Sequence, residues 1–460
     1  MLRTWQSQCI DKALEKYRCG GKHFLGQATP GAGKTVMAAY VGKNLIDANM
    51  IDLILCLSPS VNIAKGFTET FSRILHCTFD GKIGARGVSL TYQSIQYIDE
   101  QFWRTLSKYR VLVVFDEIHH CAGDKLTQAN AWGEQIILKL QTLAQYTLAL
   151  TGTPWRSDKL PITLLSYSSP EGRVLCDYQY SLKHAVLDKV CRKPKIVLVD
   201  NEQLELTIED KNKYYTSIQA LRSEEKISYS SILNNENALI HTLSLATERL
   251  DLIRQDNPHA AGLVVALSIA HARKIQNILS NTFGQSSILV SHQDPNAQSM
   301  IERFRRGKSK WIISIGMIAE GTDIPRLQVC CHLSNILTEL FFRQVLGRIL
   351  RITDASNQQA WLYTLAEENL VQFAQSIEND IPDSCLYINS SQPFVGPSNE
   401  GEIEQLQIAT TRFGEKPSQD RASDSELDWD GDLGRTPKFT QVSLSFGYFK
   451  EQVIEAFCSL

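Results

Sequence analysis

Residues 23–47 read HFLGQATPGAGKTVMAAYVGKNLID and place a short apolar run, a glycine-rich loop and a helical pattern in direct succession. The apolar run predicts a strand, and the apolar spacing after the loop predicts a helix. Gly31 and Gly33 let backbone N–H groups close around phosphate, and the N-terminus of the helix adds its dipole. In such a loop Lys34 reaches the β- and γ-oxygens of a nucleotide, and Thr35 holds Mg²⁺. The stretch therefore predicts a nucleotide-phosphate site in an α/β domain.

The loop departs from the general phosphate-binding pattern at its first position, where Ala28 stands in place of glycine. The glycines that form the turn are retained, so the departure has little effect on the interpretation. A glycine-rich turn that only caps an ordinary helix is the alternative.

A second stretch, VLVVFDEIHH over 111–120, ends an apolar strand pattern in two adjacent carboxylates. Asp116 is placed to bind the Mg²⁺ beside the phosphate loop, and Glu117 to polarise an attacking water. Two solvated acids at a strand end are the alternative. His119 and His120 have no cysteine or carboxylate set at ligand spacing, so a zinc site is not expected.

The composition excludes several classes of protein. The chain has 460 residues, 43% of them hydrophobic, with 47 Lys and Arg against 50 Asp and Glu. The net charge of -3 does not indicate a polyanion partner, so any nucleic-acid surface must be a local patch. No apolar run approaches the roughly 20 residues of a membrane helix, and we expect a cytoplasmic protein. The 11 cysteines are scattered without a CxxC pair, as expected for reduced thiols.

Apolar runs alternate with helical patterns in two separate parts of the chain. Strands are predicted for HFLGQA, IDLILCLS, RGVSLTY, RVLVVFD and YTLALTG, and again for AGLVVAL, SSILVS, KWIISIG, LQVCCHLS and QQAWLYTLA. Val, Ile and Leu on both faces are typical of parallel strands covered by helices. We expect two tandem α/β domains, over 1–165 and 258–377, with a helical connector over 166–257. The acidic, Ser- and Pro-rich region 378–460 is expected to be irregular and partly flexible; its apolar end either docks on a domain or begins a further unit.

Further motifs follow in a fixed order. They are LRTWQSQCI, ATPGAGKT, LSPSVNIAKGF, TYQS, VLVVFDEIHH, LTGTPWRSD, GLVVALSIAHARKI, SIGMIAEGTDIPRL and FRQVLGRILR. The ordered set resembles the superfamily-two helicases and translocases with a DExH box, in the branch of restriction-enzyme motor subunits and phage-type DNA helicases. The resemblance covers residues 2–366. It implies an α/β fold of two tandem RecA-like P-loop domains, each with a parallel sheet, and ATP and Mg²⁺ as cofactors.

The resemblance also implies roles for individual residues. The ATP-binding residues are Arg3, Gln6, Thr29, Pro30, Gly31, Ala32, Gly33, Lys34, Thr35, Gly321 and Asp323, with the Gln6 amide on the base. The catalytic residues are Lys34, Asp116, Glu117, Gln344, Arg348 and Arg351, and the metal ligands are Thr35 and Asp116. Ser58, Thr91, Ser94, His119, Thr151, Thr153, Ser268 and Thr322 contact nucleic acid or couple its movement to hydrolysis.

The two arginines are expected on one helix that follows TELFFRQVLG, with Gln344 one turn before Arg348. They would neutralise charge on the transferred phosphoryl group, so both domains would be needed to complete the site. The alternative for the arginines is that they are solvated residues on the protein surface. The alternative for the hydroxyls expected at nucleic acid is that they cap helices or turns. The basic stretch ERFRRGKSKW over 302–311 is either a solvated face or an auxiliary backbone contact. Trp5, Trp132, Trp155 and Trp311 are expected in cores or at the domain interface.

Three functions agree with these motifs. The first is an ATP-dependent DNA helicase or translocase, the second an RNA-dependent DExH ATPase, and the third an ATP-gated clamp on nucleic acid that recruits a partner without unwinding. No nuclease, methyltransferase or zinc module is recognised in the chain, so cutting would require a separate nuclease or effector protein. The expected partner is nucleic acid, DNA before RNA, held through its backbone.

Overall fold

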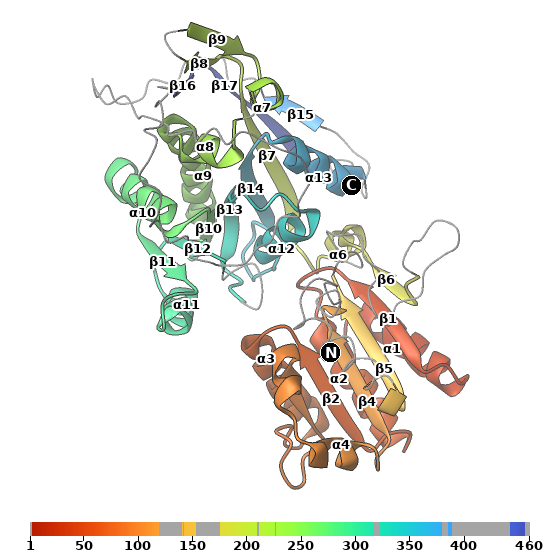
Figure 1. Ribbon diagram of the computed structural model, residues 1–460. Coiled ribbons are helices and arrows are strands. Elements are labelled where there is room, and N and C mark those ends of the chain that lie inside the picture. Colours follow the sequence, from red (N-terminus) through yellow and green to blue (C-terminus); the bar gives the residue numbers. More distant parts are fainter. Residues whose placement is uncertain are drawn as a thin grey trace, which may run out of the picture.

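The computed structural model describes residues 2–118, 140, 142–152, 175–208, 211–225, 227–316, 323–379, 385–388 and 442–455. These residues form two α/β lobes, which lie one above the other in Figure 1 and are joined by the segment 190–192. Within these ranges, no helix has both the length and the apolar character needed to cross a membrane.

The first lobe is built on a six-stranded sheet in which every pair of neighbours is parallel. In spatial order its strands are β3 (Gly87–Thr91), β2 (Leu53–Ser58), β4 (Val111–Asp116), β5 (Tyr146–Thr151), β1 (His23–Ala28) and β6 (Tyr178–Tyr180). All residues of β4 and β5 are buried, as expected for strands with helices on both faces. β5 lies between β1 and β4, so the loops after these three strands share one edge of the sheet.

Five helices and a 3₁₀ turn of the described residues surround this sheet. They are α1 (Thr4–Arg18), α2 (Lys34–Asp47), α3 (Val61–Leu75), the 3₁₀ turn η1 (Tyr92–Tyr97), α4 (Glu100–Leu106) and α6 (Leu182–Leu187). α3 begins where the Ser60 hydroxyl accepts from the Ile63 N–H, and it ends at His76 in the left-handed conformation. Its Phe67 and Phe71 are buried and stack at a centroid distance of 5.9 Å.

The second lobe has an eight-stranded mixed sheet. Its spatial order is β11 (Ser287–Ser291), β12 (Trp311–Ile315), β10 (Ala261–Ala266), β13 (Leu327–Leu333), β14 (Gln359–Leu365), β7 (Lys193–Asn201), β17 (Phe449–Glu455) and β15 (Cys385–Ile388). The strands from β11 to β7 are parallel, whereas β17 runs antiparallel to both of its neighbours. The strands within 258–377 are thus parallel, as expected, and the sheet is mixed because β17, which lies outside that range, joins its edge.

The helices of the second lobe are α7 (Ile218–Glu225), α8 (Tyr229–Asn234), α9 (Glu236–Asp256), α10 (Ile269–Asn277), the π turn η3 (Ile278–Thr282), α11 (Ala297–Arg306), α12 (Glu339–Ile349) and α13 (Glu368–Asn379). α9 packs on β13 and β14. A small antiparallel sheet of β16 (Val442–Phe446), β8 (Leu204–Ile208) and β9 (Lys211–Tyr215) lies at the far end of this lobe (Figure 1).

The ten strands predicted from apolar runs are all present. The division into domains stays a prediction, but the second sheet uses residues of the expected connector, because β7 pairs in parallel with β14 along its length. The run Ile196–Val199 is the sequence signal for this strand. The apolar end of the chain docks on the second lobe through β16 and β17, one of the two expected outcomes.

Candidate functional site

The phosphate loop connects β1 to α2 in a conformation that depends on two glycines. Gly31 and Gly33 have φ values of 82° and 95°, in the left-handed region that glycine adopts without strain. The Thr29 N–H donates to the Tyr180 carbonyl (3.1 Å), and the Ala32 N–H donates to the Thr29 carbonyl (3.2 Å). The loop is therefore anchored to β6 before it enters α2 at Lys34.

Arg3 and Gln6, at the start of α1, hold the same loop from the other side. Arg3 Nη1 donates to the Ala32 carbonyl (2.6 Å), and Gln6 Nε2 donates to the Gly33 carbonyl (3.0 Å). Gln6 Oε1 in turn accepts from the Arg3 N–H (2.9 Å). Both residues thus hold the phosphate loop, and the expected contact of the Gln6 amide with a base stays a prediction.

The acid pair lies at the end of β4, directly beside the loop. Lys34 Nζ and Glu117 Oε1 are 2.6 Å apart, with the two side chains 12% and 22% exposed. Glu117 Oε2 also accepts from the Gly152 N–H (3.1 Å) and the Thr151 hydroxyl (3.4 Å). Glu117 has a φ of 48°, uncommon for a residue with a side chain and a feature found at functional sites.

Asp116 is buried with 6% of its surface exposed, and the Tyr92 hydroxyl donates to its carbonyl oxygen (2.7 Å). The carboxylate of Asp116 and the hydroxyl of Thr35 are the oxygen donors that Mg²⁺ prefers. The Lys34–Glu117 ion pair shows that the ends of β4 and the phosphate loop are in direct contact, so this donor set fits a metal bound with nucleotide phosphates. Tyr92 and Gly152 were missed as individual residues; they lie within the quoted motifs TYQS and LTGTPWRSD.

The second lobe reaches this loop through α12 and the residues after it. A Cβ placed on Gly347 would lie 2.8 Å from the Cβ of Pro30, so the absence of a side chain allows α12 to touch the loop. A Cβ placed on Gly31 would lie 3.5 Å from the Cγ of Arg351. Gln344 and Arg348 are on α12, but the helix ends at Ile349, so the expectation that Arg351 is helical was wrong. Leu350 caps the helix and Arg351 follows it.

Arg351 pairs with the carboxylate of Asp323, and Arg305 of α11 lies 3.9 Å from the other oxygen of the same carboxylate. Burial, and then the neighbouring Arg305, lower the pKa of Arg351 to about 10. The guanidinium is still charged at neutral pH. The structure thus brings Asp323 to an arginine, while its expected contact with ATP stays a prediction.

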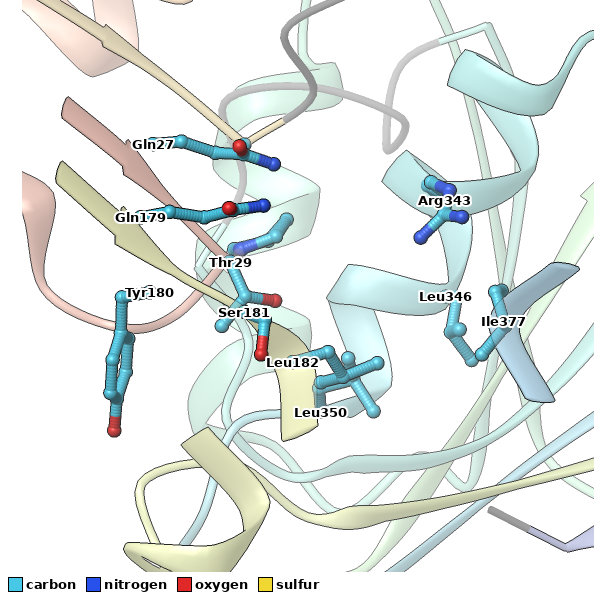
Figure 2. A pocket seen from close by; sticks show the side chains of 12 residues that line it. Gln27, Thr29, Gln179, Tyr180, Ser181, Leu182, Arg343, Leu346, Leu350 and Ile377 are labelled. Atoms are coloured by element: carbon cyan, nitrogen blue, oxygen red, sulfur yellow. The ribbon is translucent and has the colours of Figure 1, made fainter. Parts of the chain in front are cut away.

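A cavity of about 160 Å³ lies between the lobes next to the phosphate loop. Figure 2 shows Gln27, Gln179 and Thr29 of the first lobe on one side and Arg343 and Leu346 of α12 on the other. Pro30, Gly152 and Leu350 also line it. The two lobes therefore enclose space at the phosphate loop.

The hydroxyls expected at nucleic acid have mainly local partners. Ser58 is fully buried, and its Oγ lies 3.4 Å from the carbonyls of Ser60 and Leu90. Its hydroxyl is therefore not accessible to nucleic acid in this state. The Thr91 hydroxyl accepts from the Ser94 N–H (3.2 Å) at the start of η1, and the Ser268 hydroxyl caps α10. These contacts match the capping alternative, and the expected phosphate contacts stay predictions.

The basic stretch at the end of α11 carries ion pairs. Arg305 lies 3.7 Å from Glu302, and Lys310 lies 2.7 Å from Asp251. Trp5 and Trp311 are buried, as expected. His119, Thr153, Gly321 and Thr322, and also Trp132 and Trp155, lie outside the described residues.

A further residue at the site has no sequence signal. Arg192, in the segment between the lobes, is fully buried and bonded to the end of α12. A lone arginine in a polar segment cannot be distinguished from a surface residue by its sequence.

Two family descriptions match the chain. Residues 1–156 match the type III restriction enzyme res subunit, and residues 244–353 match the helicase conserved C-terminal domain. The first match contains the phosphate loop, and the second contains α12 with Arg348 and the following Arg351.

Among curated relatives, an uncharacterized protein of Mycobacterium leprae is 29% identical over 82% of this chain and 64% of its own length. A DNA 3'-5' translocase, XPB2, of Sulfurisphaera tokodaii is 23% identical over 77% of this chain and 79% of its own. The chain thus spans less than two thirds of the mycobacterial relative.

Among solved structures, a fragment of a putative HsdR subunit of a type I restriction enzyme from Vibrio vulnificus is similar in fold. It has a TM-score of 0.57 and 17% identity, over 81% of this chain and 65% of that one. The two family matches and the order of the motifs support a superfamily-two helicase or restriction-enzyme motor family for this chain, and the solved structure shows the same fold of tandem lobes.

Proposed function

We propose that the protein is a nucleic-acid-stimulated ATPase that uses hydrolysis between its lobes to move on DNA. The observation that carries this proposal is the contact of α12 with the phosphate loop, where Gly347 meets Pro30 and the stem of Arg351 lies at Gly31. A group on the second lobe can therefore act on a nucleotide bound by the first. Opening and closing of the lobes would change this contact once in each cycle.

In the proposed reaction, the loop amides and Lys34 bind the phosphates of ATP. Lys34 must then exchange its ion pair with Glu117 for a phosphate oxygen, which releases the Glu117 carboxylate to polarise water. Mg²⁺, held by Thr35 and Asp116, would neutralise charge on the β- and γ-oxygens. Arg348 and Arg351 would stabilise the charge on the γ-phosphoryl group when the lobes close.

DNA is favoured as the track because the XPB2 relative is described as a DNA translocase. The test is the ATPase rate of the whole chain with single-stranded DNA, blunt duplex, forked DNA and RNA. We expect stimulation by DNA above that by RNA. Stimulation by RNA alone would show that the protein acts on RNA and not on DNA. If no nucleic acid stimulates hydrolysis, the proposal is contradicted.

A strand-displacement and a triplex-displacement assay separate movement from clamping. A motor displaces a strand in at least one of them while it hydrolyses ATP. Strong stimulation of hydrolysis with no displacement in either assay would instead identify an ATP-gated clamp.

A further inference from the structure

The chain passes from the first lobe to the second through Val190, Cys191 and Arg192. Within these residues, the backbone N–H groups change from donating to an acceptor in the first lobe to donating to one in the second. The N–H groups of Val190 and Cys191 donate to the Ala185 carbonyl of α6, at 2.7 and 3.0 Å. The Arg192 N–H donates to the Leu350 carbonyl of the second lobe, at 2.7 Å. The changeover between lobes therefore lies between Cys191 and Arg192.

The side chain of Arg192 is fully buried in the second lobe. Its Nη1 donates to the carbonyls of Leu327 (2.6 Å) and Ile349 (3.2 Å), and its Nη2 donates to the Thr353 hydroxyl (3.2 Å). Within the described part of the chain, no carboxylate forms an ion pair with it. Burial lowers the pKa of Arg192 to about 10, so the group is a buried cation at neutral pH. Burying a cation without a counter-ion lowers the stability of the fold, so we expect Arg192 to have a function that offsets this cost.

The partners of Arg192 surround one residue. Ile349 is the last residue of α12, and the carbonyls at a helix C-terminus carry partial negative charge that a guanidinium satisfies. Thr353 lies two residues after Arg351. Cys191 forms an isolated antiparallel bridge with Arg351, and its Sγ lies 3.6 Å from the Pro30 carbonyl. Arg351 is thus held between the segment that links the lobes and the phosphate loop.

We propose that Arg192 is a positioning residue that sets the place of Arg351 at the nucleotide by fixing the chain on both sides of it. This inference rests on the proposed ATPase. A misplacement of about 1 Å at a reacting group can lower the rate by about 10²-fold, so loss of this anchor reduces turnover without removing any group that contacts ATP. Because the anchor is in the segment that links the lobes, a change in their angle is transmitted directly to Arg351.

The experiment compares Arg192→Lys with Arg326→Lys. Lysine keeps the charge but loses the planar fork that bonds several acceptors at once. Arg326 is a matched control: it is buried in the same lobe, donates to the carbonyls of Gly307 and Ser309 after α11, and also has its pKa lowered to about 10 by burial. Both variants are expected to lower the melting temperature by similar amounts.

Only Arg192→Lys is expected to lower the kcat of DNA-stimulated hydrolysis, by about tenfold or more. The affinity for a fluorescent non-hydrolysable ATP analogue should stay within about twofold, because no contact with ATP is removed. An equal fall in kcat for both variants would reduce Arg192 to a structural role and overturn the inference.

A second comparison tests whether Arg192 acts through Arg351. In an Arg351→Ala background, Arg192→Lys should change the residual kcat by less than about twofold, because there is no arginine left to position. The same fold-decrease in both backgrounds would contradict the inference. If Arg192→Lys does not fold, Thr353→Val removes one acceptor and should lower kcat by about threefold in the parental background only. Failure of the parental chain to hydrolyse ATP with any nucleic acid would instead contradict the proposed function.

Discussion

The two lobes bring their groups to the nucleotide in different ways. In the first lobe, Lys34 and Gly152 each bond to Glu117, and Arg3 and Gln6 hold the loop, so these contacts form without the second lobe. In the second lobe, Arg351 follows α12, pairs with Asp323 and depends on the linking segment for its position. Under the proposed function, the first lobe therefore provides the groups that bind the phosphates, and the second lobe provides the arginines that raise the rate of hydrolysis.

This difference predicts that binding and turnover are separable by lobe. Changes in the second lobe should lower kcat and leave nucleotide affinity nearly intact, whereas changes in the phosphate loop should affect affinity first.

The largest effect is expected at the arginines of the second lobe. Arg348→Ala and Arg351→Ala should each lower DNA-stimulated hydrolysis by about 10³-fold or more, the range for arginines that stabilise a transferred phosphoryl group. Steady-state ATPase assays and titration with a fluorescent ATP analogue measure the two properties. Arg18→Ala, an exposed arginine at the end of α1, is the control and should change neither. Stimulated turnover that survives in both variants would rule out a site completed by two lobes.

Within the first lobe, two substitutions should separate binding from chemistry. Glu117→Gln should lower turnover by about 10²–10⁴-fold, the usual contribution of a general base. It should still bind ATP, since it also releases Lys34 from its ion pair. Lys34→Ala should lose nucleotide affinity instead. Parental turnover in Glu117→Gln would show that another group activates the water.

The same contrast explains how much of the site could be predicted from sequence. The phosphate loop and the acid pair are contiguous motifs in which a strand, a turn and a side chain occur in fixed order, so the sequence predicts that Lys34 and Glu117 lie close together, and the structure places them 2.6 Å apart. Arg351 lies just after α12 and not on it, and the Ile349 carbonyl at the end of this helix accepts from Arg192, 157 residues away in the chain. No local pattern contains that contact.

The fold shows the same limit. Ten apolar runs predict ten strands that the structure contains, whereas β7 lies in the range expected to be a connector, because its pairing with β14 is a long-range contact. The antiparallel β17 joins the sheet after a stretch of acidic, Ser-rich sequence and was likewise not assigned to a sheet. Ser58 was expected at nucleic acid because of its motif, whereas its burial depends on how β2 and β3 pack.

A third prediction concerns acid, to which the lobes should respond differently. His271 and His332 are both buried in the second lobe, and burial lowers the pKa of each from 6.5 to about 4. His271 accepts from the Leu267 N–H, and His332 lies between Phe341 and Phe342. Because their pKa is lower in the folded state, their contribution to stability is complete above pH 6.5 and is lost as pH falls through about 4.

Each histidine should remove about 3 kcal/mol from the free energy of unfolding at the acid limit. Hydrogen exchange at pH 7.5 and pH 5, corrected for intrinsic rates, should show greater loss of protection in β10, β13 and α10 than in β4 and β5. His332→Leu should reduce this acid sensitivity, and the exposed His184→Gln should not. Equal loss of protection in both lobes would contradict the assignment of acid sensitivity to the second.

The smallest effects are expected on the affinity for nucleic acid. Both lobes contribute small hydroxyl side chains to the proposed binding surface. Thr91 and Ser94 belong to the first lobe and Ser268 to the second, and in this state they cap η1 and α10. A hydroxyl at a turn or helix N-terminus contacts phosphate without reading a base edge. Affinity for unrelated DNA sequences of equal length should therefore agree within about threefold. It should fall with salt, at a shallow slope, because the chain carries a net charge of -3.

Ser94→Ala should weaken DNA binding by about fivefold, the equivalent of about 1 kcal/mol for one hydrogen bond, with Ser107→Ala in an exposed position as its control. Ser268 is less suitable, because loss of its cap destabilises α10 itself. Fluorescence anisotropy with a non-hydrolysable ATP analogue, across salt concentrations, measures these affinities. If Ser94→Ala binds as the parental chain does, the hydroxyl serves only to cap η1, and the grip must come from elsewhere. A strong preference for one sequence would contradict recognition through the backbone. Undetectable binding under all these conditions would contradict the proposal that nucleic acid stimulates hydrolysis between the two lobes.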